Sequence, residues 1–242
     1  MSTESGSAHE EHHGRENRLS MAMENYLLSI LRLQEQEIKV TPAQLSEHFK
    51  SLPTAEGLGT SLPSVSAMIG RMIKERLVTL TPSKEVSLTK EGRTSAESMV
   101  RRHRLAERLA VDILNVDLKR AHEEAHRLEH AVSPYLESKI VEVLGNPTTC
   151  PFGHPIPGSS YKPTSKLVRL SDAEVSKKYK IDRIPEDDAE LLSYFVDNNF
   201  MPEKSIEIVD ASRARGVITV GTDNGDLVFS IKVATIIWVR LS

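Results

Sequence analysis

Apolar residues near the start of the chain recur at helical spacing. Residues 23–33 carry an apolar face at intervals of three and four, which predicts a helix. Thr41 followed by Pro42 predicts the start of a second helix, because proline is favoured at the first helical position. Residues 61–74 carry a third helical face, after an unusually long Ser-, Thr-, Gly- and Pro-rich loop at 51–61.

The spacing then changes from helical to alternating. Residues 77–80 and 86–88 alternate apolar with polar positions around a Pro-Ser-Lys turn, which predicts a two-stranded hairpin. Three helices followed by such a hairpin indicate a winged helix-turn-helix, which we place at residues 18–92.

The rest of the chain divides into a helical part and a β part. Residues 93–150 continue at helical spacing in three segments, the last starting at Ser133 and Pro134, and suggest a helical domain with an apolar pairing surface. A Pro- and Gly-rich linker is expected at 151–166. Short β-branched segments follow at 205–209, 217–220, 227–231 and 236–241. We therefore expect a mainly α protein with a small all-β C-terminal domain, a small β-barrel over residues 167–242.

Composition and charge narrow the function classes. No apolar run is long enough for a membrane span, and the polar start of the chain, which we expect to be a disordered tail over residues 1–17, does not resemble a signal peptide. The single cysteine, Cys150, fits a reducing compartment, so we expect a cytoplasmic protein. The net charge is -3, but residues 61–104 hold nine Lys or Arg against four Glu, about +5. A polyanion would therefore bind the first half of the chain.

The densest chemical pattern is HEEAHRLEH, residues 122–130. At about 100° per residue, the side chains of His122, His126, Glu129 and His130 share one helix face. His103 and Glu107 share a face of the preceding helix at i and i+4. Two such faces packed together would form one or two mixed nitrogen and oxygen metal sites, and the hard carboxylates favour Mn(II) or Fe(II), with Zn(II), Co(II), Ni(II) or Cd(II) as substitutes.

The same pattern allows an enzyme. HEEAH matches the H-E-x-x-H motif of zinc hydrolases, in which His122 and His126 would bind zinc and Glu123 would activate water. Glu129 and Val132 stand where the extended motif requires glycine and histidine. We prefer the non-enzymatic interpretation, without a small organic substrate, and keep the zinc hydrolase as the alternative.

Small and basic residues lie in and around the third predicted helix and the wing. Small side chains at the front of that helix can approach base edges, while lysine and arginine suit phosphate contacts. The candidate DNA-binding residues are Ser61, Pro63, Ser64, Ser66, Ala67, Arg71, Lys74 and Lys84, and further basic side chains at 76, 93, 101, 102 and 104 are expected to surround them.

Three separated motifs give the chain a family resemblance. HRLAERLAVDIL, HEEAHRLEHAVS and CPFGHPIPG occur in this order after the winged-helix pattern, and the chain resembles the diphtheria toxin repressor family of iron- and manganese-dependent regulators from about Leu19 to Ser242. The resemblance implies a homodimer that binds a palindromic operator in double-stranded DNA when loaded with metal and represses, or sometimes activates, genes of metal uptake. It also implies that residues 93–150 form a metal-binding and dimerisation domain and that the C-terminal domain is an SH3-like barrel of the ferrous-transport-associated type.

The resemblance also implies roles for individual residues. His126, Glu129 and His130 match the main metal position, and Asn25 falls where the family usually supplies Met or Asp from the first helix. The second metal position is matched by His103, Glu107 and His122, with Asp188 and Cys150 as further candidate ligands.

Overall fold

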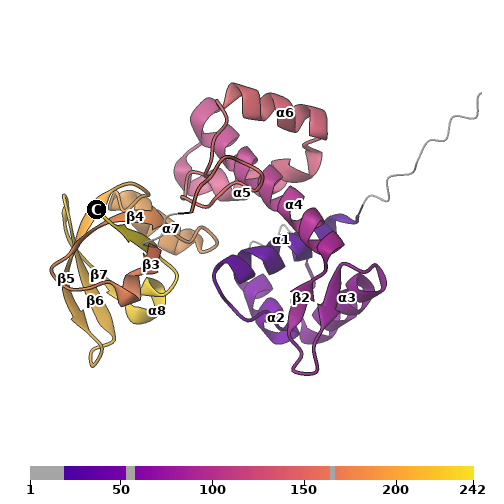
Figure 1. The fold of residues 1–242 in the computed structure, drawn as a ribbon, viewed down its shortest axis with the longest axis horizontal. Coiled ribbons are helices and arrows are strands. Elements are labelled where there is room, and N and C mark those ends of the chain that lie inside the picture. The colour runs from indigo at the N-terminus through magenta and orange to yellow at the C-terminus, as the bar shows by residue number, and fades with distance from the viewer. Residues whose placement is uncertain (1–18, 53–57, 164–166) are drawn as a thin grey trace, which may run out of the picture.

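The computed structural model describes residues 19–52, 58–163 and 167–242. The predicted tail, the middle of the loop at 51–61 and the end of the predicted linker lie outside these residues. In the described part, three lobes follow each other along the chain (Figure 1).

The first lobe has the expected order of elements. They are α1 (Met21–Glu35), α2 (Pro42–Ser51), α3 (Leu62–Lys74), β1 (Val78–Leu80) and β2 (Val86–Leu88). Ser20, Thr41 and Ser61 cap the three helices, each accepting a hydrogen bond from the backbone N–H three residues on. Helical periodicity and good caps therefore agree in this lobe, and the predicted winged-helix elements form.

One apolar core joins these helices to the start of α4 (Lys90–Arg108). Tyr26 of α1 packs on Phe49 of α2 at a ring separation of 4.6 Å, and both are buried. Met99 and Val100 of α4 belong to the same core. The rest of α4 continues into the second lobe, so one helix links the two lobes (Figure 1).

The second lobe is helical. A π-helical turn (Leu109–Ile113) ends α4, and α5 (Leu118–Leu128), a 3₁₀ turn (Glu129–Ala131) and α6 (Pro134–Val143) follow. The sequence pattern predicted residues 122–130 as one continuous helix, but the helix tightens into the 3₁₀ turn at Glu129. This turn changes the directions in which Glu129 and His130 project.

The Pro- and Gly-rich segment forms an irregular loop that packs against the C-terminal lobe. Phe152 is fully buried in the C-terminal core, and its carbonyl accepts a hydrogen bond from Ile184 N at 3.1 Å. Gly153 has φ +91°, and a Cβ there would lie 2.0 Å from the carbonyl oxygen of Asp182. Only glycine fits this close approach.

The C-terminal lobe is a six-stranded antiparallel sheet in the order β3-β8-β4-β5-β6-β7. The strands are β3 (Leu167–Arg169), β4 (Lys178–Arg183), β5 (Ser205–Ser212), β6 (Val217–Thr222), β7 (Gly225–Ser230) and β8 (Trp238–Leu241). Register shifts at Ile181/Arg183 and Ile208/Asp210 mark irregularities of the kind that bend a sheet. The lobe also holds α7 (Ala189–Asp197) and the short α8 (Ile231–Ala234), two helices that the sequence pattern did not predict.

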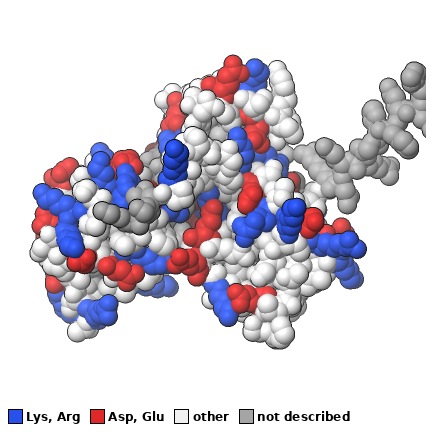
Figure 2. All heavy atoms as spheres, in the orientation of Figure 1, with Lys and Arg blue, Asp and Glu red and all other residues white. Residues whose placement is uncertain are grey.

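Charge is mixed over the surface. Blue and red side chains are interspersed on the face shown in Figure 2, and none of the three lobes is of one sign there. None of the helices in the described residues is long and apolar enough to cross a membrane.

The start of α4 provides a test of the packing between wing and core. A Cβ on Gly92 would lie 1.8 Å from the carbonyl oxygen of Leu77, whereas a Cβ on Gly70 of α3 meets nothing within 4 Å. We expect Gly92→Ala to lower the free energy of unfolding by about 2–3 kcal/mol because backbone must move. Gly70→Ala should raise it by about 0.5–1 kcal/mol through helix propensity. Urea denaturation of both variants measures this, and equal effects would contradict the packing.

Candidate metal centre

Two helices and a turn bring the predicted ligands together. His103 and Glu107 lie one turn apart on α4 and are fully buried. His122 and His126 lie one turn apart on α5, facing them. The 3₁₀ turn then directs Glu129, also fully buried, into the same space.

His103 joins the two predicted metal positions into one cluster. Its Nδ1 lies 2.6 Å from Oε2 of Glu129, and its Nε2 lies 3.0 Å from Oε1 of Glu107. His126 Nδ1 is 3.3 Å from the other Glu129 oxygen. A single imidazole therefore bridges the two buried carboxylates.

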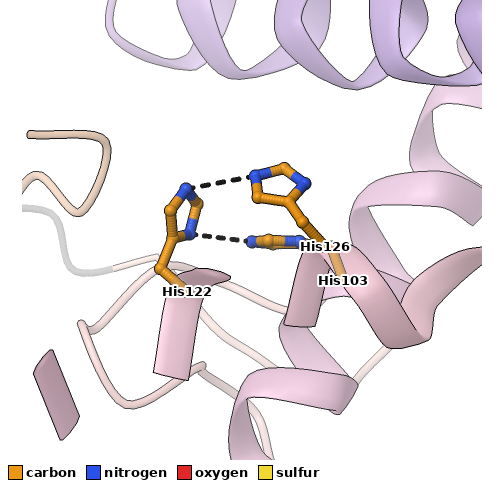
Figure 3. Close-up of side chains that lie close together, drawn as sticks. All are labelled: His103, His122 and His126. Atoms are coloured by element: carbon orange, nitrogen blue, oxygen red, sulfur yellow. Dashed lines mark hydrogen bonds between the residues drawn. The ribbon is translucent and has the colours of Figure 1, made fainter. Parts of the chain in front are cut away.

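The three imidazoles of the cluster face one another (Figure 3). His122 Nδ1 is 3.1 Å from His103 Nε2, and His122 Nε2 is 3.2 Å from His126 Nε2. One ring nitrogen from each of the three residues lies within 4.8 Å of the others. Imidazole nitrogens at this separation can converge on one transition-metal ion.

The C-terminal lobe adds carboxylates that the sequence analysis did not identify. Glu186, which is buried, brings a carboxylate oxygen within 4.8 Å of ligand atoms of Glu107 and His122. Asp187 Oδ1 lies 3.4 Å from Nε2 of His122. His154 of the irregular loop, also missed, lies 2.7 Å from the Glu186 carboxylate. The acidic Glu-Asp-Asp run was the available signal, but the pattern did not show which carboxylate turns inward.

Asp188 was the wrong choice from that run. It is exposed and caps α7, accepting hydrogen bonds from the backbone N–H groups of Glu190 and Leu191 at 3.0 Å. A carboxylate at a helix N-terminus is already well satisfied. The structure thus places Glu186 and Asp187, and not Asp188, at the cluster.

Helix α1 contacts the cluster at His130. Oε2 of Glu24 lies 2.8 Å from Nδ1 of His130, and its Oε1 accepts a hydrogen bond from Arg102 at 3.1 Å. Asn25, the predicted ligand of α1, is buried, and its Oδ1 has no hydrogen-bond partner among the described residues. An unpartnered buried amide oxygen is free to bind a cation, and Glu24 is an anionic neighbour that the sequence analysis missed.

Burial and charge set the protonation of the cluster. Burial alone would favour the neutral forms, but Glu107 and Glu129 raise the pKa of His103 to about 10. His126 is affected in the opposite direction: burial and the charge on His103 lower its pKa to about 4. The pKa of Glu129 falls to about 2 because the stabilisation by His103 and His126 outweighs its burial. His126 is therefore neutral and can act as a metal ligand, beside the ionised carboxylate of Glu129.

Cys150 lies near the carboxylates of Glu107 and Glu186. The side chain is fully buried, and burial together with the negative charges of Glu107 and Glu186 raises the pKa of its thiol. One oxygen of Glu107, Oε2, has no hydrogen-bond partner among the described residues. A divalent cation would neutralise such carboxylates and favour the thiolate, so the residues present fit a metal ion.

The predicted DNA-binding residues lie on one exposed surface. Six of them lie on α3 (Pro63, Ser64, Ser66, Ala67, Arg71, Lys74), Ser61 caps it and Lys84 lies on the wing turn; all eight are exposed. Three more distant basic residues were wrongly expected there. Arg101 pairs with Glu137, Arg102 with Glu24 and the fully buried Arg104 with Glu35, so all three serve internal ion pairs.

The alternative zinc-hydrolase interpretation fails on geometry. Glu123 should face the metal together with His122 and His126, but its side chain is 43% exposed and pairs with Arg127 on the outer face of α5. A general base must reach the water bound to the metal, which this carboxylate does not. The HEEAH pattern therefore arises from one buried and one solvated face of the same helix.

A winged helix joined to a buried cluster of histidines and carboxylates defines a class of metal-responsive DNA-binding proteins. Residues 89–158 match the family model of the iron-dependent repressor metal-binding and dimerisation domain, and residues 168–241 match the FeoA domain. The first match extends into the Pro- and Gly-rich segment predicted as a linker.

Similar proteins extend these matches to nearly the whole chain. The iron-dependent repressor IdeR of Mycobacterium leprae is 32% identical over 217 residues, covering 84% of this chain and 90% of the relative. The diphtheria toxin repressor of Corynebacterium efficiens is 42% identical over 135 residues, covering 56% of this chain and 55% of the relative. The chain belongs to the family of iron-dependent and diphtheria toxin repressors, which are transcriptional regulators and not enzymes.

Solved structures agree with this assignment. A manganese-dependent transcriptional repressor in complex with manganese has 31% identity and a TM-score of 0.79, covering 91% of this chain and 100% of that chain. The manganese regulator SloR has 27% identity and a TM-score of 0.77, covering 93% and 100%. The predicted fold class is confirmed, and these comparisons give the hydrolase alternative no support.

The low pKa of His126 predicts an acid-sensitive step in the metal-free protein. Its folded-state pKa of about 4 lies below the unfolded value near 6.5, so only the unfolded state gains this proton as the pH falls between the two. Stability should therefore decline from about pH 6.5 towards pH 4, before the carboxylates titrate. We expect His126→Gln to make this decline shallower in urea denaturation with chelator present. An unchanged slope would contradict the neutral assignment.

Proposed function

We propose that this protein is a Mn(II)- or Fe(II)-responsive repressor that binds a palindromic operator as a homodimer in the cytoplasm and controls metal uptake. The observation that carries the proposal is the buried cluster centred on His103. Burying several carboxylates and imidazoles without a cation is costly, and a buried ion would stabilise them.

Two adjoining ligand groups support the proposal. The first comprises His126, Glu129 and His130, with Asn25 and Glu24 contributed by α1. The second comprises His103, Glu107, His122 and Glu186, with Asp187 and Cys150 nearby. Carboxylate and imidazole donors suit Mn(II) and Fe(II), and Zn(II), Co(II), Ni(II) and Cd(II) are the expected substitutes. When bound, the metal supplies positive charge to carboxylates that only imidazoles and arginines now neutralise.

Helix α1 connects the first group to the DNA-binding lobe. Glu24 contacts His130 at 2.8 Å, while Tyr26 and Leu27 on the same helix lie in the winged-helix core. A change in how tightly Glu24 and Asn25 are held therefore moves a rigid element of the DNA-binding lobe. Regulation requires that metal binds more tightly to the DNA-competent arrangement.

The second lobe offers a surface for a second copy of the chain. Within the segment that matches the family's dimerisation domain, five apolar side chains are exposed: Ile113, Leu114, Tyr135, Leu136 and Val143. Burying them between two copies would remove apolar surface from water and would place two α3 helices for a palindromic site.

Glu129 tests metal control directly. We expect Glu129→Gln to abolish Mn(II)- and Fe(II)-activated binding to operator DNA, because it removes the buried carboxylate that contacts three of the imidazoles. Electrophoretic mobility shifts with each metal and with chelator, using operator DNA identified by genomic footprinting, measure the effect. The loss should exceed the roughly tenfold to hundredfold that replacing a residue that only supports a metal ligand typically costs.

Glu123→Gln is the matched control, since it makes the same change on the exposed face of α5, the helix that leads into the 3₁₀ turn of Glu129. It should retain metal-activated DNA binding. Equal DNA affinity of the unchanged protein with metal and with chelator would refute metal control.

Lys84 tests the DNA-binding surface. If the wing contacts a phosphate through Lys84, Lys84→Ala should reduce the slope of log affinity against log salt concentration by about one per protomer. Lys178→Ala, an exposed charge in the C-terminal lobe, should leave the slope unchanged. Fluorescence anisotropy with operator DNA between low and moderate salt measures both, and identical slopes for the two variants would exclude Lys84 from the contact.

A further inference from the structure

Arg32 of α1 is nearly buried and joins the DNA-binding lobe to the C-terminal lobe. One guanidinium nitrogen, Nη2, lies 2.7 Å from Oε1 of Glu186 and 2.7 Å from Oδ1 of Asp187. The guanidinium side chain is only 8% exposed. Both carboxylates belong to the segment that enters α7 of the C-terminal lobe, so this contact fixes that lobe against the DNA-binding lobe.

The carboxylates that Arg32 holds also face the second ligand group. Glu186 lies with Glu107 and His122 in a group whose ligand atoms are within 4.8 Å of one another. Asp187 contacts His122 at 3.4 Å. A metal ion in this group and the guanidinium of Arg32 would therefore compete for the carboxylates of Glu186 and Asp187.

In the first group the arginine contact is smaller and does not involve the central carboxylate. The Glu129 carboxylate contacts only imidazoles among the described residues, at 2.6, 3.3 and 3.5 Å from His103, His126 and His130. Arg102, the nearest arginine, bonds to the carboxylate of Glu24 and to the main-chain oxygen of Glu129. Arg32 therefore holds two carboxylates at the second group, each at 2.7 Å. Arg102 holds one carboxylate of the first group at 3.1 Å and leaves Glu129 to the imidazoles.

There is space beside Arg32 for the guanidinium to move. A cavity of about 180 Å³ lies between α1, α2 and the C-terminal lobe and is lined by Arg32, His48, His154, Glu186 and Asp187, among others. Arg32 can therefore release Glu186 without displacing a packed core.

We propose that Arg32 is the internal counter-ion of the second ligand group: it holds Glu186 and Asp187 to α1 when that group is empty and opposes metal binding there. The two groups then fill in order, the first at lower metal concentration. The inference rests on the proposed metal-responsive function and adds an order of filling to it.

Metal titration of the full chain tests the order of filling. Isothermal titration calorimetry with Mn(II), without oxygen, should show two steps of different affinity for the unchanged protein. Arg32→Gln should tighten the weaker step about tenfold or more, because the positive charge that competes for Glu186 and Asp187 is removed. The tighter step should stay within threefold. A weaker step that is unchanged or loosened would overturn the proposal.

Arg169→Gln is the matched control. Arg169 also joins the C-terminal lobe to the end of α1, donating to the carbonyl of Gln36 at 2.7 Å and pairing with Glu37 at 2.9 Å, but it contacts neither ligand group. It should leave both steps unchanged. A similar tightening in this variant would mean that loosening the interface, and not removing the competing charge, causes the effect, which would overturn the proposal.

A second variant tests whether the charge of Arg32 is what matters, and a second measurement does not depend on calorimetry. Arg32→Lys keeps the charge and should leave the weaker step within threefold of the unchanged protein; a tenfold tightening would overturn the proposal. Hydrogen exchange of the metal-free protein should be faster in residues 184–197 of Arg32→Gln than of Arg32→Lys, and equal exchange would overturn the holding role. Absence of Mn(II) binding to the unchanged protein would refute the proposed function itself. Two-step binding whose affinities are the same in Arg32→Gln would refute only this inference.

Discussion

Buried negative charge at the junction of three lobes is the constraint on which this structure depends. Glu107, Glu129 and Glu186 lie almost entirely out of water, where an uncompensated carboxylate is very costly. The fold compensates them with imidazoles from α4, α5 and the irregular loop and with arginine from α1. Each partner comes from a different segment, so neutralising these charges also holds the lobes together.

Helix α1 is the element that both ends of this network share. Glu24 contacts the network through His130, and Arg32 contacts it through Glu186 and Asp187. Between them, the apolar side chains of α1 pack into the winged-helix core. A single helix therefore connects both ends of the network to the core of the DNA-binding lobe.

Local pattern was sufficient for most of the elements and for the central ligands. Capping residues and helical periodicity predicted α1, α2, α3 and α6, and the i, i+4 spacing of His103 with Glu107 and of His122 with His126 placed them on facing surfaces. The pattern missed α7, whose nine residues follow an acidic run. It also extended α5 through Glu129, because the tightening into a 3₁₀ turn has no strong sequence signal.

The sequence by itself determined which residue types are available to bind a cation and on which helices they lie, because helical spacing is a local property. Only the tertiary structure decided that Glu24, Glu186 and Asp187 approach the cluster and that Asp188 does not. It also decided that Arg101, Arg102 and Arg104 neutralise internal carboxylates. The partners of a buried charge come from distant segments, and which of two neighbouring side chains points inward depends on packing that no local pattern records.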